Sequence, residues 1–441
     1  MFSETKRQLV HIAMVGWAFL LRVIDWPQAA ALAVAALLFN AFVLPRAGGR
    51  AIFRPEDLRR GIPAGILYYP LAVLVLILVF RHRLDIAAAA WAILAVGDGA
   101  ATLAGRWFGG PRLPWNRDKT WAGTATFAAT GGAAGVLLCW WTQPNVPVEV
   151  PAWFVTAAPL AAAVAAALVE TIPVRLDDNL SVPAAAGAML WLSSLVDPAA
   201  ASAALPGVVA RLLPAVLVNA GFAAVAYLEG AVTMSGAIGG VLVGMAMYVG
   251  AGWEGWLLLL AAFASAVVSS KVGWQRKQAL GIAEEREGRR GMGNALANCL
   301  AAAIAALLAI LSPFQAAAWL ALVTALTAGA ADTVASEIGK AWGRRTFLVA
   351  GFSPVPPGTS GAITFEGTLA NIAAAAGLAL LAAMLGLIGT SAVPAVVAAS
   401  LAGAFLESVL GATLEKPGIL NNDLLNFINT AAAVGIVLLL A

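Results

Sequence analysis

Two aspartates stand inside long apolar segments, and a similar pattern of residues follows each of them. An aspartate, a glycine and a base recur at identical spacing, as Asp98, Gly105 and Arg106 in one copy and as Asp332, Gly339 and Lys340 in the other. A charged side chain in a membrane helix costs about 2.5–3.5 kcal/mol on insertion scales, so it usually lines a site or a water-filled cavity. We therefore expect two polar sites. The alternative is a pair of packing aspartates that Arg106 and Lys340 neutralise.

Further acidic residues follow each aspartate and complete two sets that suit a divalent cation. The sets are Asp98, Glu170 and Asp178 in the first half, and Asp332, Glu407 and Asp423 in the second. Mg²⁺ prefers oxygen ligands and is commonly held by one or two carboxylates together with substrate phosphates. Phosphoryl transfer also needs cations near the transferring group, and the nearby bases are Arg106, Lys119, Lys340 and Arg344. The pattern predicts Mg²⁺-dependent phosphate chemistry.

Glycines and hydroxyl residues near these acids could bring backbone N–H groups to phosphate oxygens. One pair, Thr120 and Gly123, recurs as Thr364 and Gly367. The stretch 356–361 resembles a loop that enters a helix N-terminus, where anions bind favourably; its candidate residues are Gly358, Thr359, Ser360 and Gly361. An ordinary Pro–Gly turn is the alternative. Because the sequence has no Walker A, kinase HRD or GxGxxG pattern, a nucleotide site would be of another type.

Four other polar residues could contact a substrate: His11, Arg290, Asn294 and Asn298. Asn294 and Asn298 lie one helical turn apart after Arg290, so hydrogen bonding between helices is the alternative. His11 follows Arg7 by four residues and could face the first site, or it could be a buried structural histidine.

The composition shows which elements must position these residues. Apolar residues make up 61% of the 441 residues and charged residues only 11%, against about 25% charged in soluble proteins. A spanning helix needs about 20 apolar residues, and we expect about fifteen spans. They lie near 8–24, 27–45, 61–80, 84–104, 121–141, 152–172, 182–199, 205–228, 231–250, 254–270, 294–311, 314–338, 361–388, 392–413 and 424–441. The balance of 26 basic and 23 acidic residues gives no indication of a nucleic-acid partner.

The distribution of Lys and Arg predicts the orientation of the chain, because cytoplasmic loops carry an excess of both. Lys6 and Arg7 place the N-terminus on the cytoplasmic side, and we expect the membrane to be a prokaryotic-type inner membrane. Alternation then places four basic stretches on the same side, at 46–60, 105–119, 271–290 and 340–345. We expect 46–60 to lie against anionic headgroups and 271–290 to be a solvated loop or short helix. Both polar sites are then cytoplasmic.

The recurring clusters predict an internal duplication. Chance similarity between alanine-rich helices is the alternative, but it does not explain rare polar clusters in the same order. We expect an all-α polytopic membrane protein with two parallel-repeat units. These are residues 1–200 and 230–441, with a linking transmembrane helix at 201–229.

The first half resembles the polyprenol kinase family of phytol and dolichol kinases. The matching residues are Gly97-Asp98-Gly99, Gly105-Arg106, Gly109, Lys119-Thr120-Trp121-Ala122-Gly123-Thr124, Glu170 and Leu176-Asp177-Asp178-Asn179-Leu180-Ser181-Val182-Pro183. That family is related to the CDP-diacylglycerol synthases and uses CTP.

The second half resembles the membrane family that contains phytyl-phosphate kinase. The matches are Gly288-Arg289-Arg290, Asn294 to Asn298, Ala331 to Lys340, Pro357 to Gly361, Glu366-Gly367-Thr368, Glu407-Ser408, Gly411-Ala412-Thr413 and Asn421-Asn422-Asp423. Together the resemblances imply a bifunctional kinase. One half would convert an isoprenoid alcohol to its monophosphate, and the other would convert the monophosphate to the diphosphate.

These implied activities assign roles to the candidate residues. The expected catalytic residues are Asp98, Lys119, Asp178, Asp332, Lys340 and Glu407. The expected nucleotide-binding residues are Gly105, Arg106, Thr120, Gly123, Asn179, Gly339, Arg344, Gly358, Thr359, Ser360, Gly361 and Asn422. The expected partners are CTP, Mg²⁺, an isoprenoid lipid and membrane lipids. Two other functions stay open, a cytidylyltransferase like the related synthases and a lipid transporter or flippase.

Overall fold

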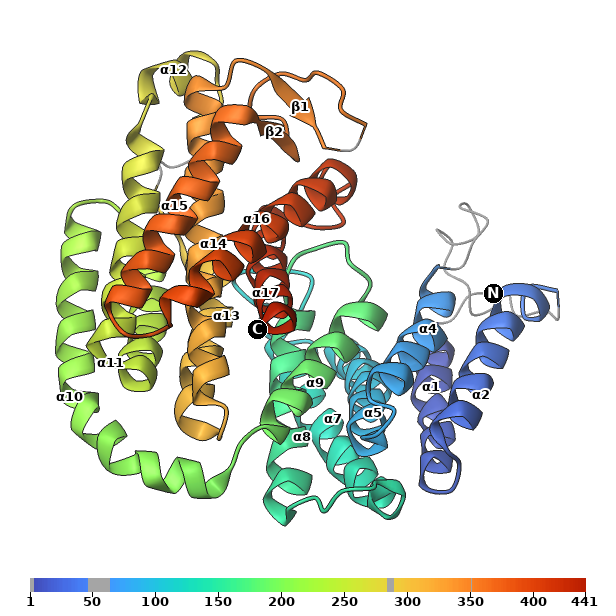
Figure 1. Ribbon diagram of the computed structural model, residues 1–441. Coiled ribbons are helices and arrows are strands. Elements are labelled where there is room, and N and C mark those ends of the chain that lie inside the picture. The colour runs from blue at the N-terminus through green and yellow to red at the C-terminus, as the bar shows by residue number, and fades with distance from the viewer. Residues whose placement is uncertain (1–3, 47–63, 284–288, 350) are drawn as a thin grey trace. The chain divides into compact units, whose positions relative to one another are not determined.

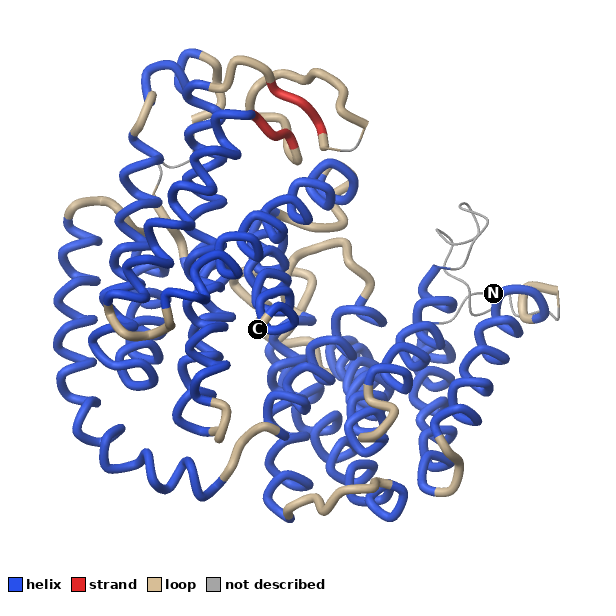
Figure 2. The backbone as a smooth tube through the Cα atoms, viewed as in Figure 1, coloured by secondary structure: helices blue, strands red, loops and turns tan. Residues whose placement is uncertain are grey.

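The computed structural model describes residues 4–46, 64–283, 289–349 and 351–441, and in these ranges the chain is almost entirely helical (Figures 1 and 2). It divides into two compact units, Met1–Leu195 and Val196–Ala441. Residues 47–60 of the basic stretch expected at 46–60, and residues 61–63 of the span expected at 61–80, lie outside the described residues.

The first unit contains eight described α-helices with short 3₁₀ and π segments between them. In chain order they are α1 (Glu4–Ala13), η1 (Met14–Arg22), α2 (Trp26–Leu38), η2 (Phe39–Val43), α4 (Ala64–Val79), α5 (Leu84–Ala92), η4 (Ile93–Asp98), α6 (Gly99–Trp107), α7 (Trp121–Thr142), η5 (Gln143–Asn145), α8 (Ala152–Glu170) and α9 (Asp178–Ser194).

The centre of the first unit is the continuous helical span from α5 through η4 to α6. Every residue of α5 is buried, and this span packs against α7, α8 and α9. The segment η4 is a single π turn that ends at Asp98. Such π turns inside helices occur frequently at functional sites because they redirect side chains. The first candidate aspartate is therefore placed in the interior of the unit, and α6 carries the chain on from it.

The second unit contains the remaining helices and a small sheet. Its elements are α10 (Pro198–Leu228), α11 (Met234–Lys271), α12 (Trp274–Ala279), α13 (Met292–Leu311), α14 (Gln315–Trp342), β1 (Thr346–Leu348), β2 (Ala362–Thr364), α15 (Phe365–Met384), η7 (Thr390–Ala392), α16 (Val393–Leu410), η8 (Gly411–Glu415) and α17 (Asn422–Leu440). The strands pair antiparallel, with Thr346 opposite Thr364.

The central helix of the second unit is α14. It packs against α11, α13, α15, α16 and α17, and the run from Leu320 to Ala331 is buried. Asp332 follows this run directly, so the second candidate aspartate also stands where a buried helix approaches its end. The alanine and glycine content of these helices permits close packing between them.

Eleven helices in the part of the chain that the structure describes are long and apolar enough to cross a membrane. They run over 26–43, 84–107, 121–145, 152–170, 198–228, 234–271, 292–311, 315–342, 365–384, 390–415 and 422–440. The expected spans 231–250 and 254–270 both fall within α11. This helix is interrupted at Gly252, where φ is 70° and ψ is −167°. A positive φ of this kind is readily adopted only by glycine, so each expected span matches one arm of α11.

One helix begins earlier than expected, and the expected linking helix is present. The helix expected at 182–199 begins at Asp178, because the Asp177 side chain accepts a hydrogen bond from the Asn179 backbone N–H and caps it there. The linking transmembrane helix expected at 201–229 corresponds to α10 (Pro198–Leu228), which is long and apolar enough to cross a membrane and packs against α11 and α13. The total of about fifteen spans stays a prediction.

Candidate functional site

Three carboxylates converge at one end of the first unit. Asp98 ends η4, Glu170 is the last residue of α8, and Asp178 is the first residue of α9. One oxygen atom from each of the three lies within 4.8 Å of the others. Asp98 and Glu170 are buried, and Asp178 is partly exposed. Carboxylates this close repel one another unless a cation lies among them, and Mg²⁺ takes such oxygen ligands. The residues therefore fit a divalent cation.

Lys119 supplies a positive charge to this cluster. Its ammonium group donates hydrogen bonds to Glu170 and, over 3.3 Å, to Oδ2 of Asp178. The loop that carries Lys119 is held against the end of α8 at Thr171. There Trp115 Nε1 donates to the Thr171 hydroxyl over 3.1 Å, and Asn116 Nδ2 donates to the Thr171 carbonyl over 3.0 Å. The two loop contacts thus fix the position of the lysine.

Burial and the neighbouring charges shift the pKa values of Lys119 and Asp178. Burial alone lowers the pKa of Lys119, but the carboxylates of Asp178 and Glu170 outweigh it, so the net shift is upward. Lys119 is therefore a cation at neutral pH and not a base. Burial raises the pKa of Asp178, the charge of Lys119 opposes that shift, and the charge of Asp98 adds to it.

His11 lies beside Asp98, as the sequence suggested that it could. Its Nε2 atom is 3.6 Å from Oδ2 of Asp98 and 3.4 Å from the Leu94 carbonyl oxygen. The imidazole also packs edge-on against Tyr69, with 4.7 Å between ring centroids. The Tyr69 hydroxyl accepts a hydrogen bond from Trp91 over 2.7 Å. Nothing in the sequence pattern had identified Tyr69.

The candidate nucleotide residues of the first unit separate into two groups. Thr120 caps α7 by accepting a hydrogen bond from the Gly123 N–H over 3.1 Å, and Gly105 faces the same hydroxyl. Asn179 is buried at the start of α9, and its Oδ1 atom has no hydrogen-bond partner among the described residues. Arg106, in contrast, is exposed at the end of α6 and forms no ion pair with any described residue. It therefore does not neutralise Asp98.

The predicted acid set of the second unit converges only in part. Glu407 on α16 lies within electrostatic range of Asp332 on α14, and its Oε2 atom is buried without a hydrogen-bond partner among the described residues. Asp423 points elsewhere, because its Oδ2 atom lies against the backbone of Gly293 at the start of α13. The only group of three acidic or metal-ligating side chains found among the described residues is the one in the first unit.

A buried ion pair lies beside the second site, and no pattern in the sequence indicated it. Glu337 and Lys277 are both almost completely buried, and the Lys277 ammonium contacts the Glu337 carboxylate. It also donates to the Ser270 carbonyl over 2.6 Å. Lys340 pairs with the same glutamate over 2.9 Å, and not with Asp332 as the packing alternative required. The short helix expected within 271–290 is present as α12, but the expectation that this stretch is solvated is wrong at Lys277.

The loop 356–361 also differs from expectation. It does not enter a helix directly, because residues Ala362–Thr364 form strand β2 before α15 begins. Gly361, with a φ of 72°, lies against the backbone of Ser408 and Ala412. The Ser360 hydroxyl donates to the carboxylate of Glu415. Thr359 donates to the Pro356 carbonyl over 2.7 Å. A carboxylate beside the loop makes it a poorer anion site than the sequence indicated.

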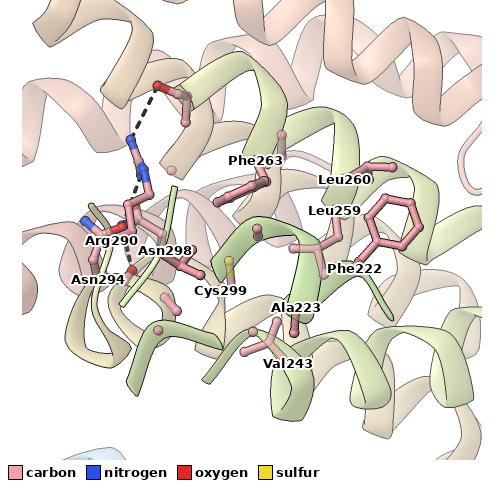
Figure 3. Close-up of a pocket in the computed structure, with 18 of the residues that line it drawn as sticks. Phe222, Ala223, Val243, Leu259, Leu260, Phe263, Arg290, Asn294, Asn298 and Cys299 are labelled. Atoms are coloured by element: carbon pink, nitrogen blue, oxygen red, sulfur yellow. Dashed lines mark hydrogen bonds between the residues drawn. The ribbon is translucent and has the colours of Figure 1, made fainter. Parts of the chain in front are cut away.

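The other candidate residues of the second unit are either exposed, packed against one neighbouring residue, or part of the lining of a cavity. Arg344 and Asn422 are exposed. Gly339 faces the hydroxyl of Thr364, which caps α15 by accepting a hydrogen bond from Gly367 over 3.0 Å. Gly358 has a φ of 82° and lies against Ile282. The predicted substrate residues Arg290, Asn294 and Asn298 line one cavity of about 180 Å³ between α10, α11, α13 and α14 (Figure 3).

The fold defines the class of protein. It is a polytopic helical membrane protein whose polar side chains gather at helix ends. Residues 217–434 match the family described as integral membrane protein DUF92. The chain belongs to this family, since a Synechocystis relative of 40% identity is covered over 78% of its length.

Three relatives show what the chain is similar to. The Synechocystis relative is an uncharacterized membrane protein, aligned over 202 residues or 44% of this chain. The chloroplast protein VTE6 of Arabidopsis thaliana is 36% identical over 202 residues, which cover 44% of this chain and 61% of VTE6. A probable chloroplast phytol kinase of Zea mays is 36% identical over 135 residues, which cover 30% of this chain and 43% of that protein. No solved structure matches the chain.

Proposed function

We propose that this protein is a membrane-embedded isoprenoid kinase with two active units. The first unit converts a long-chain isoprenoid alcohol, such as phytol or geranylgeraniol, to its monophosphate. The second unit converts the monophosphate to the diphosphate. CTP is the proposed phosphoryl donor and Mg²⁺ the proposed metal ion. Relatives named as probable phytol kinases support kinase chemistry on an isoprenoid alcohol. The motif of the second half, which resembles the phytyl-phosphate kinase family, supports the second step.

The observation that carries the proposal is the cluster of Asp98, Glu170 and Asp178 with Lys119. The three carboxylates would hold Mg²⁺, which when bound neutralises charge on the donor phosphates. Lys119 stays protonated beside them, and its ammonium group can neutralise negative charge on the phosphoryl group during transfer. The Thr120 cap and Gly123 leave the first backbone N–H groups of α7 facing the same end of the unit, where they favour an anion.

The chemical step is an in-line displacement at phosphorus. In the first unit the alcohol oxygen bonds to the γ-phosphorus of the donor, and the bond from that phosphorus to the β–γ bridging oxygen breaks. The nucleoside diphosphate leaves with the electron pair of that bond, and the hydroxyl proton passes to a carboxylate of the cluster. In the second unit a phosphate oxygen of the lipid makes the equivalent attack, and Asp332 and Glu407 take the part of the acids.

The decisive experiment uses membranes from expressing cells with labelled CTP and phytol or geranylgeraniol. Asp98→Asn should reduce monophosphate formation by about 10²- to 10³-fold, the loss typical of removing one group that stabilises a transition state. The same variant should still convert added monophosphate. Asp332→Asn should instead accumulate monophosphate. The exposed acids Asp118 and Glu229 offer matched controls, and Asp118→Asn and Glu229→Gln should behave as the parent protein.

The products test the class of reaction. Release of CDP is the expected result, and release of pyrophosphate would mean that the protein is a cytidylyltransferase. Normal diphosphate formation by both aspartate variants would overturn the assignment of the two sites. Transport of lipid in liposomes without turnover of nucleotide would overturn the enzymatic proposal altogether.

A further inference from the structure

The cavity of the second unit is polar at one end and apolar at the other. Arg290, Asn294 and Asn298 lie together at one side, and Phe222 and Leu260 lie at the opposite side (Figure 3). Arg290 is the only charged side chain among the described residues that line the cavity, and no carboxylate accompanies it there. The cavity is thus suited to an amphiphile whose polar part is anionic.

The polar end has hydrogen-bonding groups without protein partners. Arg290 donates from Nη1 to the Asn294 side chain over 3.1 Å and from Nη2 to the Ala266 carbonyl over 3.4 Å. Its Nε atom and Oδ1 of Asn298 are buried, and neither has a partner among the described residues. A buried polar group left unpaired costs about 1–3 kcal/mol. Arginine pairs with phosphate through several donors at once, so a phosphate would satisfy the free Nε.

At the far end of the cavity the one polar lining side chain beside Trp256, Asn219, already has hydrogen-bond partners for its Nδ2 and Oδ1 atoms. Phe222 and Trp256 pack edge-on with 4.8 Å between ring centroids. The one donor of Trp256 is already used, because its Nε1 donates to Oδ1 of Asn219 over 3.0 Å. Val243, Leu259 and Leu260 complete an apolar surface. A bound amphiphile must therefore place its head at Arg290 and its chain toward Phe222.

The size of the cavity limits the chain. A cavity of about 150 Å³ lined by apolar side chains binds a single benzene molecule, so a cavity of about 180 Å³ accommodates a segment of one chain and not two chains side by side. On the α10 side the wall includes two small residues, Ala223 and Ala226, beside Asn219 and Phe222. Much of the rest of α10 is exposed, as at Leu217 and Leu228, which lets a chain continue into lipid.

We propose that this cavity binds the head-proximal isoprene units of a single-chain isoprenoid monophosphate, with the phosphate at Arg290. The inference rests on the proposed function of the second unit and names its acceptor site. Thr333, the neighbour of Asp332 on α14, lines the same cavity, so the bound phosphate is delivered to the helix that carries the proposed catalytic aspartate. A volume of this size favours a lipid with one chain over a lipid with two acyl chains.

Direct binding tests the site without the reaction. Purified protein in detergent is titrated with radiolabelled geranylgeranyl monophosphate in the absence of nucleotide. Ala223→Phe fills the wall of the cavity and should weaken binding at least tenfold. Ala224→Phe adds the same group at the next position of α10, which is exposed and does not line the cavity, and should bind as the parent protein does.

A second variant separates a head-group role from a general loss of structure. Arg290→Gln should weaken binding of the monophosphate at least tenfold while leaving binding of labelled geranylgeraniol unchanged. Competition with dioleoyl phosphatidic acid should have little effect. Three results would each overturn the proposal. They are equal binding of the monophosphate by Ala223→Phe and Ala224→Phe, unchanged monophosphate binding by Arg290→Gln, and full competition by phosphatidic acid.

The two proposals fail in different ways. If the monophosphate binds as expected but no diphosphate forms with any nucleotide, the cavity is a lipid-phosphate site and the kinase assignment is wrong. If diphosphate forms at the normal rate in Ala223→Phe, the kinase assignment stands and the acceptor lies elsewhere.

Discussion

The two units share a local arrangement around the helix that follows each aspartate. In the first, Thr120 caps α7 through Gly123, which lies against the backbone of Ala101 three residues after Asp98. In the second, Thr364 caps α15 through Gly367, which lies against the backbone of Ala335 three residues after Asp332. Corresponding residues thus make corresponding contacts, which supports the proposal of an internal duplication.

The charges around this shared arrangement differ. In the first unit three carboxylates converge, and one lysine contacts two of them. In the second unit two lysines hold one buried glutamate, and the third predicted acid lies against Gly293. An alcohol is a neutral acceptor and benefits from a carboxylate that takes its proton, whereas a monophosphate is an anion and benefits from nearby cations. The difference therefore matches the order of steps that we propose.

The largest effect on stability is expected at the buried pair of the second unit. Lys277→Met leaves Glu337 with only the more exposed Lys340, and breaking a buried pair typically costs about 3–5 kcal/mol. Lys340→Met should cost about 1 kcal/mol or less, as partly exposed pairs do. Thermal unfolding in detergent measures both. The double variant Lys277→Met/Glu337→Leu should recover most of the loss, because it removes both fully buried charges and leaves only Lys340, which is partly exposed to solvent.

A matched control for this prediction is Lys271→Met at the exposed end of α11, which should change the unfolding temperature little. If Lys277→Met is no less stable than Lys271→Met, the buried pair is not a structural feature of the second unit, and the contrast between the units loses its main support.

A smaller effect, of about tenfold, is expected on cation binding in the first unit. The Lys119 ammonium contacts two of the three carboxylates, so it competes with a divalent cation for them. Lys119→Met should tighten Mn²⁺ binding about tenfold while reducing monophosphate formation. Electron paramagnetic resonance of free Mn²⁺ measures the affinity. Arg112→Met, in the same loop and exposed, is the control.

Asp332→Asn tests whether the tighter Mn²⁺ site belongs to the first unit and not to the second. Because no third carboxylate joins Asp332 and Glu407 among the described residues, this variant should leave the tighter Mn²⁺ site unchanged. Weaker Mn²⁺ binding in Lys119→Met, or loss of the tight site in Asp332→Asn, would mean that the cation does not bind where the three carboxylates converge.

These contrasts also show how far the sequence alone could lead. The convergence of Asp98, Glu170 and Asp178 was predictable, because each acid belongs to a polar motif near the end of an apolar segment, and the expected alternation of the segments brings these ends to the same side. The burial of Lys277 was not, because it depends on Glu337, sixty residues further along the chain. The local sequence around a lysine in a polar stretch does not indicate such a distant partner. The direction of Asp423 depends in the same way on packing between α17 and α13.

The smallest expected effect tests the shared arrangement itself. A Cβ atom at Gly123 would lie 3.2 Å from the Ala101 carbonyl oxygen, and one at Gly367 would lie 2.8 Å from that of Ala335. The first contact needs a shift of a few tenths of an ångström, whereas the second forces a backbone to move. Overpacking of this kind costs about 1–3 kcal/mol, so Gly367→Ala should be about 1 kcal/mol less stable than Gly123→Ala.

Gly377→Ala provides the reference, because a Cβ atom there meets nothing within 4 Å and alanine favours a helix over glycine by about 1 kcal/mol. It should therefore be neutral or slightly stabilising in thermal unfolding. Gly123→Ala and Gly367→Ala should both unfold at a lower temperature than Gly377→Ala. Each of these two glycines lies where a capped helix packs against the helix that carries an aspartate. If Gly123→Ala and Gly367→Ala match Gly377→Ala, the close approach of these helices is not needed in either unit. The parallel between the two sites would then rest on sequence spacing alone.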